Sequence, residues 1–185
     1  VAAAINCAIT GDCPRYYGHP NGRSINGLTL KRPVAANGKV RERRLAEECV
    51  TGPQPVWKLI GVGSVGSQTL LGIARLEALR SDARFVDQIA VWPFETEFER
   101  NLKRPITIVE IYPSLFDVPE KAGTPRDRMQ VETAARRFAE LDAAGDLVTI
   151  LSAPQDMSIG DRDAVLKEEG WIAGIACQPL LRGKV

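Results

Sequence analysis

Residues 106–113 read Ile106-Thr-Ile-Val-Glu-Ile-Tyr-Pro113, and this stretch decides how the chain around it is interpreted. Its β-branched and aromatic residues favour a strand, which the proline would end. Residues 88–94 have the same character, with Pro93 near their end, and predict a second strand. Glu110 is unusual here, because a carboxylate in an apolar strand is costly to bury unless it is paired, protonated or bound to a metal.

Two longer segments predict helices. Residues 67–80 are apolar on most sides, which predicts a largely buried helix. Residues 124–144 give the clearest helical pattern, and Gly145 supplies the stop. The apolar residues of this second helix share one face, which we expect to pack inward: Val131, Ala134, Ala135, Phe138 and Leu141.

The C-terminal part continues the alternation of strands and helices. Residues 147–151 predict a strand or the approach to one, and residues 161–169 predict a last helix, capped by Asp161 and ended by Gly170. Trp171 is expected in the core. Strands that alternate with helices predict an α/β fold, and we expect residues 1–185 to form a single α/β domain.

The N-terminal part is less regular. Residues 8–39 are rich in Gly, Pro and Asn and predict a long loop region. Residues 40–50 are highly charged and predict a short, mostly solvated helix. Residues 56–60 predict a short strand or a helical turn.

Composition bounds the class of protein. The chain has 185 residues, of which 44% are hydrophobic, and this composition is typical of a globular domain. Its net charge of +1 gives no strong overall electrostatic attraction to nucleic acid or to a membrane. No apolar run approaches the roughly 20 residues that cross a bilayer. Four cysteines without a disulfide pattern favour reduced thiols and a cytoplasmic location. The chain opens on Val1 without a signal-peptide pattern, as if inside a structured segment, so we expect further residues upstream.

Glu110 and Asp127 form the candidate catalytic pair. Asp127 lies in the first turn of the 124–144 helix, four residues before Val131, and we expect it to share the inward face and to point toward Glu110. Clustered carboxylates are the ligands that Mg²⁺ or Mn²⁺ requires, and such ions support phosphodiester cleavage.

Each acid also has a purely structural interpretation. Thr124 has the spacing of an N-cap with Asp127 at the third helical position, so Asp127 could serve only to cap its helix. Glu110 could pair with Arg126 or Arg128. Both arginines are equally candidates for contacts with a phosphate group.

Several segments resemble a family of predicted ribonuclease-H-like nucleases that carry a domain of unknown function. Some members of that family have names linked to cobalamin or molybdopterin biosynthesis, although no residue here indicates such chemistry. The matching segments keep the same order along the chain and are Arg15-Tyr-Tyr-Gly-His-Pro20, Trp57-Lys-Leu-Ile-Gly-Val-Gly-Ser-Val-Gly-Ser-Gln68, Val91-Trp-Pro-Phe-Glu95, Val109-Glu-Ile-Tyr-Pro113, Asp127-Arg-Met-Gln-Val131 and Glu168-Glu-Gly-Trp-Ile172.

The resemblance implies a ribonuclease-H-like sheet with flanking helices, of which this chain would be the C-terminal portion without the N-terminal strands. It also implies a divalent-metal site of about four acids, of which Glu110 and Asp127 match two. The expected function is that of a metal-dependent nuclease or other phosphodiester-acting hydrolase, with nucleic acid or a nucleotide as partner. A scaffold domain without catalysis is an alternative, and the oligomeric state stays open.

Residues 61–66, Gly61-Val-Gly-Ser-Val-Gly66, match the glycine-rich form of a dinucleotide-binding turn at the start of a helix. In this alternative the chain is a nucleotide- or phosphate-binding module that uses the Gly61–Ser67 turn, with Gly63, Ser64 and Ser67 as contacts. The acid expected about 20 residues further on, after a second strand, is missing. Close packing of the glycine turn is the structural interpretation.

Three other patterns are weaker. Cys7, Cys13, His19 and Cys49 do not have the spacing of a structural zinc site. His19 is the only histidine, so it alone could serve a Ser-His-Asp triad, and its Gly/Pro setting predicts a surface residue. The residues Arg41, Arg43 and Arg44 are expected on a solvated helix face, where they could meet phosphates.

Overall fold

The computed structural model describes residues 1–183 except 11–14, 34–40 and 100–102. The chain divides into two compact units, Val1–Val86 and Asp87–Val185. Both mix helices with short extended segments, and regular strands are found in the second unit. None of the helices in the described part of the chain has the length and apolar character that crossing a bilayer requires.

A short parallel strand pair organises the second unit. Strands β1 (Ile89–Val91) and β2 (Ile106–Ile108) pair in the register Ile89↔Ile106. The two strand predictions are confirmed with shorter bounds. Beyond the end of β2, Glu110 forms an isolated parallel bridge with Ile172, which brings a distant part of the chain beside this segment.

The core of the second unit forms where these segments meet. Its most buried side chains come from the strand β1, from the helices and from the segments that connect them, and they are Ile89, Leu115, Leu141, Ile150 and Ile172. Trp92 is buried, and its indole N–H donates to Leu151 O at 3.0 Å. Trp171 is also buried, as expected. Apolar burial and a satisfied indole are what a small core needs to be stable.

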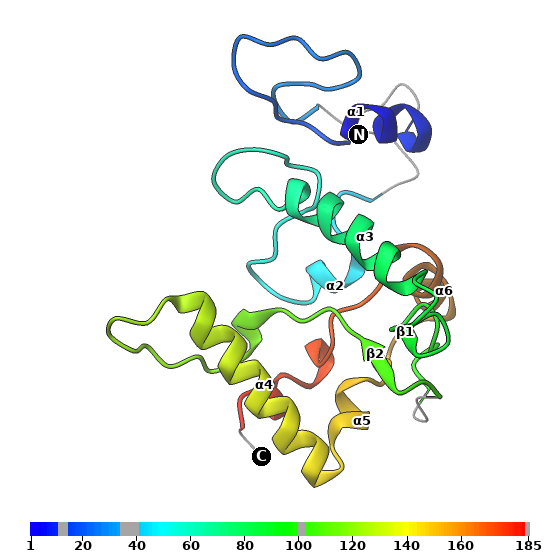
Figure 1. Cartoon of the computed structure of the whole chain (residues 1–185), viewed down its shortest axis with the longest axis vertical. Helices are drawn as coiled ribbons and strands as arrows, with labels where there is room; N and C mark the ends of the chain where they lie inside the picture. The colour runs from blue at the N-terminus through cyan, green and yellow to red at the C-terminus, as the bar shows by residue number, and fades with distance from the viewer. Residues whose placement is uncertain (11–14, 34–40, 100–102, 184–185) are drawn as a thin grey trace. The chain divides into compact units, whose positions relative to one another are not determined.

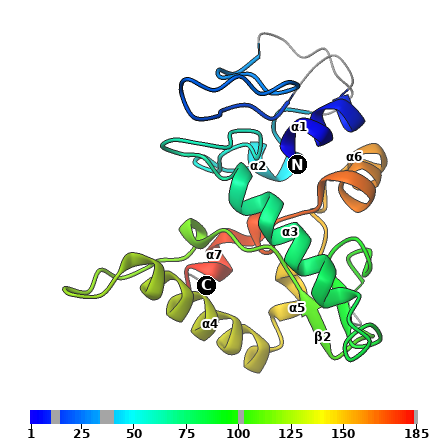
Figure 2. The same cartoon turned by 45° about the horizontal axis from the view of Figure 1, so that its top comes forward.

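The long helix α4 (Arg126–Ala144) ends as its sequence predicts, because Gly145 adopts the left-handed conformation at φ 79°. Its beginning differs from the prediction. Pro125 is the N-cap and no side chain caps the helix, so the capping role of Thr124 was wrong. The helix runs along one side of the second unit and leads into α5 (Figure 1, Figure 2).

The buried face of α4 is rotated from the predicted one. Met129, Ala134 and Leu141 are buried, whereas Val131 is 69% exposed. Phe116 packs against Phe138, with ring centroids 6.1 Å apart, and this contact draws the 134–141 stripe inward. Val131 lies about 60° around the helix from Ala134, on the solvent side of that stripe.

The rest of the second unit is helical. Residues 147–150 form the helix α5 (Leu147–Ile150), so the strand prediction for 147–151 was wrong. The carbonyls of this segment accept from both local and distant donors: Ser152 Oγ donates to Val148 O, and Gly174 N donates to Ile150 O at 2.9 Å.

The helix predicted over 161–169 begins earlier and changes type. Helix α6 (Ile159–Ala164) is capped by Ser158, whose Oγ accepts from the Asp161 amide, so Asp161 is not the cap. A π-helical turn η3 (Val165–Glu169) continues it to Gly170. The sequence did not indicate the 3₁₀ turns η2 (Pro113–Leu115) and η4 (Ile175–Cys177) or the last helix α7 (Gln178–Leu181).

The first unit opens with α1 (Ala2–Ile5) and the π-helical turn η1 (Asn6–Thr10). The described part of the 8–39 region is otherwise irregular, with single bridges such as Tyr17↔Thr29. Of residues 40–50 the structure describes 41–50, and within these only Leu45–Glu48 form a helix, α2, which is not mostly solvated because Ala46 and Glu47 are buried.

Helix α3 (Gly66–Arg80) confirms the helix predicted over 67–80 but not its burial. Leu71 is 69% exposed and Ile73 is 59% exposed, and among its residues only Gly66 is buried. The apolar content of this helix therefore did not predict its burial. Composition alone does not predict burial where the apolar residues follow no clear amphipathic period.

Candidate functional site

Glu110 lies just beyond the carboxyl end of β2, in an exposed position. Its backbone is fixed, because Ala173 N donates to Glu110 O at 2.9 Å. The expectation of a buried, costly carboxylate was therefore wrong, since β2 ends two residues earlier at Ile108. An exposed carboxylate at this end of a parallel strand stands where open α/β sheets bind ligands.

Asp127 lies in the first turn of α4 and is exposed. It was expected to share an inward face with Val131, but Val131 itself faces solvent. A carboxylate at the start of a helix also complements the partial positive charge of that end. Asp127 is thus available to solvent ions and is not directed into the core.

An open hollow of about 400 Å³ lies between the segment that follows Glu110 and the first turns of α4. We call it the Arg126 hollow. It has a polar and an apolar part, and its lining residues are Pro113, Ser114, Phe116, Asp117, Val118, Pro119, Arg126 and Gln130. A second hollow of about 320 Å³ shares Val118, Pro119 and Arg126 with it and adds Lys121, so the Arg126 side chain borders both spaces.

The two candidate acids flank the Arg126 hollow along the chain. Glu110 comes three residues before the lining residue Pro113, and Asp127 directly follows Arg126. Neither acid is itself part of the lining. In the described ranges, no three side chains of His, Cys, Asp or Glu come together as a metal cluster.

The two arginines of this turn have different surroundings. Arg128 Nε lies 2.7 Å from Glu132 Oε1, and the hydrogen bond to Glu132 raises the pKa of Arg128. The same bond lowers the pKa of the Glu132 carboxyl. Arg126 has no ion-pair partner among the residues that the structure describes. Of the two predicted phosphate contacts, Arg126 is therefore the one that lines an open hollow and forms no ion pair within the described residues.

The glycine turn of the first unit has the backbone that its sequence suggests. Gly61 and Gly63 are left-handed, at φ 96° and 71°, and Ser64 N donates to Gly61 O at 3.1 Å. The Lys58 ammonium donates to Val62 O across the turn. Ser67 Oγ donates to Leu59 O at 2.7 Å. Two of the donors that a phosphate would need are therefore used within the turn.

Gly66 explains why the motif ends on glycine. A Cβ at this position would lie 2.3 Å from Val56 O and 2.8 Å from Lys58 O. The preceding segment forms a single parallel bridge, Tyr17↔Lys58, and Gly66 N donates to Lys58 O at 2.9 Å. The start of α3 thus lies directly on this segment, which favours the close-packing interpretation of the glycines.

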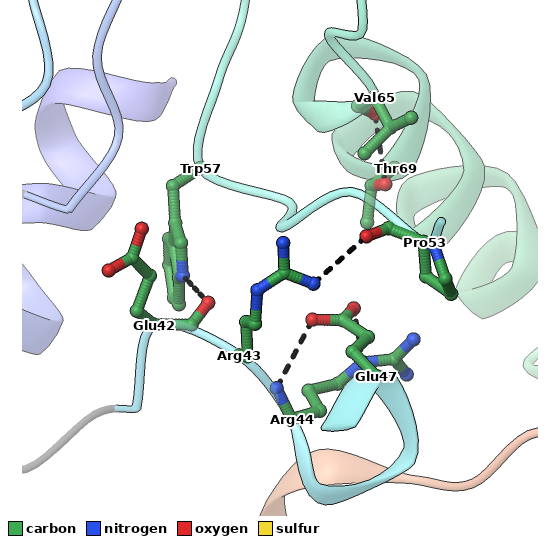
Figure 3. A network of polar contacts seen from close by, with 8 residues as sticks. All are labelled: Glu42, Arg43, Arg44, Glu47, Pro53, Trp57, Val65 and Thr69. Carbon is green, nitrogen blue, oxygen red and sulfur yellow. Dashed lines mark hydrogen bonds and ion pairs between the residues drawn. The ribbon is translucent and has the colours of Figure 1, made fainter. Parts of the chain in front are cut away.

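Two of the three arginines expected to meet phosphates, Arg43 and Arg44, are engaged in structural contacts (Figure 3). Arg43 Nη1 donates to Pro53 O at 3.0 Å. Arg44 pairs with Glu47, which is 3% exposed, through Nε at 3.0 Å, and its amide N donates to the same carboxylate at 3.1 Å. Trp57 Nε1 donates to Glu42 O at 2.7 Å. The buried Glu47 was the residue missed from sequence, where it looked like any other charge on a solvated helix.

The histidine and cysteine patterns do not form sites in the described residues. His19 is buried rather than at the surface, with Nδ1 3.1 Å from Pro20 O. Cys7 and Cys49 are exposed, and Cys13 lies outside the described residues. Loop residues 15–20 fold inward because Tyr16 packs edge-on against Trp57, with ring centroids 5.0 Å apart.

The described geometry therefore singles out one region of the second unit, where Glu110, Asp127 and the Arg126 hollow follow one another along the chain. Its side chains offer carboxylate oxygens for a hard cation and a guanidinium for an oxyanion. Compared with protein-family models, with curated proteins and with solved structures, the chain matches none of them.

Proposed function

We propose that this chain is part of a ribonuclease-H-like, metal-dependent enzyme that cleaves phosphodiester bonds. Glu110 and Asp127 serve as two of its carboxylate ligands for Mg²⁺ or Mn²⁺. The observation that carries the proposal is the exposure of both acids next in sequence to the segments that line the Arg126 hollow, with Glu110 just beyond the carboxyl end of a parallel strand and Asp127 in the first turn of α4. Ligands bind at that end of the strands in open α/β sheets.

The donor chemistry fits such an ion. Carboxylate oxygens are the preferred ligands of Mg²⁺ and Mn²⁺, and two exposed acids can reach a hydrated cation without the cost of burying charge. When bound, the cation supplies a water of lowered pKa and neutralises charge that develops on the phosphate. Glu110 is fixed through its backbone by Ala173, which would hold this ligand in place.

Arg126 has a separate role in this proposal. Its guanidinium borders the hollow and can donate two parallel hydrogen bonds to a phosphate, which orients the scissile bond. Ser114 and Gln130 line the same space and offer further donors. The alternative phosphate site, at the Gly61–Ser67 turn, has less support because Lys58 and Ser67 donate to carbonyls of their own segment.

Mn²⁺ binding by the 185-residue chain tests the proposal. Electron paramagnetic resonance titrations should show saturable binding that Glu110→Gln or Asp127→Asn each weakens by about tenfold or more, because even the loss of an outer-shell partner weakens metal sites by that factor. Asp142→Asn is the matched control, an exposed acid near the other end of α4. Equal binding in all four proteins would overturn the assignment and favour a non-catalytic domain.

A further inference from the structure

We propose that the Arg126 hollow and the hollow beside it hold a phosphodiester between two nucleoside units, with the phosphate on Arg126 and one unit in each space. This inference rests on the proposed function and names its substrate class as a single-stranded oligonucleotide, with a dinucleoside monophosphate as the smallest ligand. The starting observation is that both hollows are lined by the same arginine.

The arrangement of donors supports a phosphate on this residue. Arg126 and Gln130 are one helical turn apart on α4, and both line the first hollow. Ser114, from η2, lines the same hollow. A planar guanidinium that is not engaged in an ion pair within the described residues matches the two free oxygens of a phosphodiester.

The walls of the first hollow are held by the core, so the space exists before a ligand arrives. Leu115 and Phe116 are buried, and Phe116 packs on Phe138 of α4. Because η2 is anchored to α4 in this way, Ser114 and Arg126 keep their spacing. A preformed site avoids the entropic cost of ordering loops on binding.

The charges of the two hollows favour a diester over a more highly charged ligand. The first contains Arg126 and Asp117, and the second adds Lys121 and Glu120. The formal charges of these linings cancel, so a triphosphate would find no excess of positive charge. A phosphodiester carries a single negative charge, so it can pair with Arg126 while it meets less repulsion from Asp117 and Glu120 than a triphosphate would. The carboxylates can accept hydrogen bonds from sugar hydroxyls or base amino groups.

The volumes of the two hollows are also consistent with small-ligand sites. Spaces of about 400 Å³ and about 320 Å³ lie near the lower end of the range seen for small-ligand sites. Each is suited to one nucleoside-sized group, and their shared wall places the linking phosphate at the side chain between them. A mononucleotide would occupy only one of the two.

Isothermal titration of the 185-residue chain with adenylyl-(3′→5′)-adenosine, in EDTA, tests this proposal. We expect saturable binding that is tighter than for adenosine 5′-monophosphate and absent for adenosine. Arg126→Met should weaken it by about tenfold or more, because a hydrogen bond to a charged group contributes on that scale. Arg136→Met removes the same charge from the same helix, outside both hollows, and should leave binding unchanged.

Three results would overturn the inference: no saturable binding of the dinucleotide, binding of adenosine with equal affinity, or equal effects of the two arginine substitutions. Since EDTA removes divalent cations, failure here is separate from failure of the metal assignment. The Glu110→Gln substitution tests the metal assignment separately from dinucleotide binding. It should keep dinucleotide binding through Arg126 while it loses Mn²⁺ binding.

Discussion

At the residue scale, Gly66 is the position with the least room for change. We expect Gly66→Ala to lower the free energy of unfolding by about 1–3 kcal/mol, because its Cβ would overlap two backbone carbonyl oxygens that cannot move aside easily. Urea unfolding of the chain measures the effect. Gly72→Ala, in the same helix with open space around it, should instead stabilise by about 0.5–1 kcal/mol. Similar effects at both positions would show that close packing at Gly66 is not important.

The thiols also differ residue by residue. Partial burial raises the pKa of Cys177, whereas Cys7 and Cys49 are exposed. Because the thiolate is the nucleophile, a raised pKa leaves less of the reactive form at a given pH. We expect iodoacetamide at about pH 8 to label Cys177 more slowly than the two exposed thiols. Its rate should rise only at higher pH.

Peptide mass spectrometry of timed samples measures these rates. Labelling in urea is the control, since all three thiols should then react alike. Cys177 labelled as fast as Cys49 in the folded chain would contradict the prediction.

At the element scale, α2 is too short to be stable through helix propensity. It is held by Arg44, which bonds the buried Glu47 from its side chain and its backbone. We expect Arg44→Met to destabilise the chain by about 2–3 kcal/mol, because it leaves a buried carboxylate without its cation. This is somewhat less than the cost of breaking a fully buried pair. Thermal unfolding checks this value.

The matched control for Arg44→Met is Arg84→Met. Arg84 pairs with Asp82 at 2.8 Å on the surface, where such pairs contribute little. The two substitutions remove the same charge, so an equal loss of stability in both would contradict the role assigned to Glu47.

The helices also show which sequence signals were sufficient to predict secondary structure. Gly145 predicted the end of α4, because a left-handed C-cap is a local requirement of the backbone. The start of α4 and the secondary structure of residues 147–150 were not predictable in the same way. Thr124 had the right spacing for a cap, but the chain enters α4 through Pro125, and a short apolar run is compatible with helix or strand.

At the scale of the whole molecule, the sequence sufficed for a mixed α/β chain and for the positions of its two strands, but their parallel pairing is seen only in the structure. The sequence did not suffice for burial, because this depends on partners far away in the chain. Ile172 bridges Glu110 from more than 60 residues further along the chain, and Phe116 packs against Phe138 of α4.

The candidate site was predictable to the same extent. Glu110 and Asp127 stood out through their positions at the ends of elements, and Arg126 through its place beside Asp127. The hollow itself could not be predicted, because it depends on how residues 113–124 lie against α4. The difference between Arg126 and Arg128 is local instead, because the partner of Arg128, Glu132, lies four residues further along the same helix.

The indole of Trp92 has a practical consequence for optical work. It is buried and hydrogen-bonded in the second unit, as Trp171 is buried there, whereas Trp57, the remaining tryptophan, belongs to the first unit. The tryptophan fluorescence of a Trp57→Phe chain would therefore come from the second unit alone. Quenching by acrylamide could then follow the opening of that unit directly, without an attached dye.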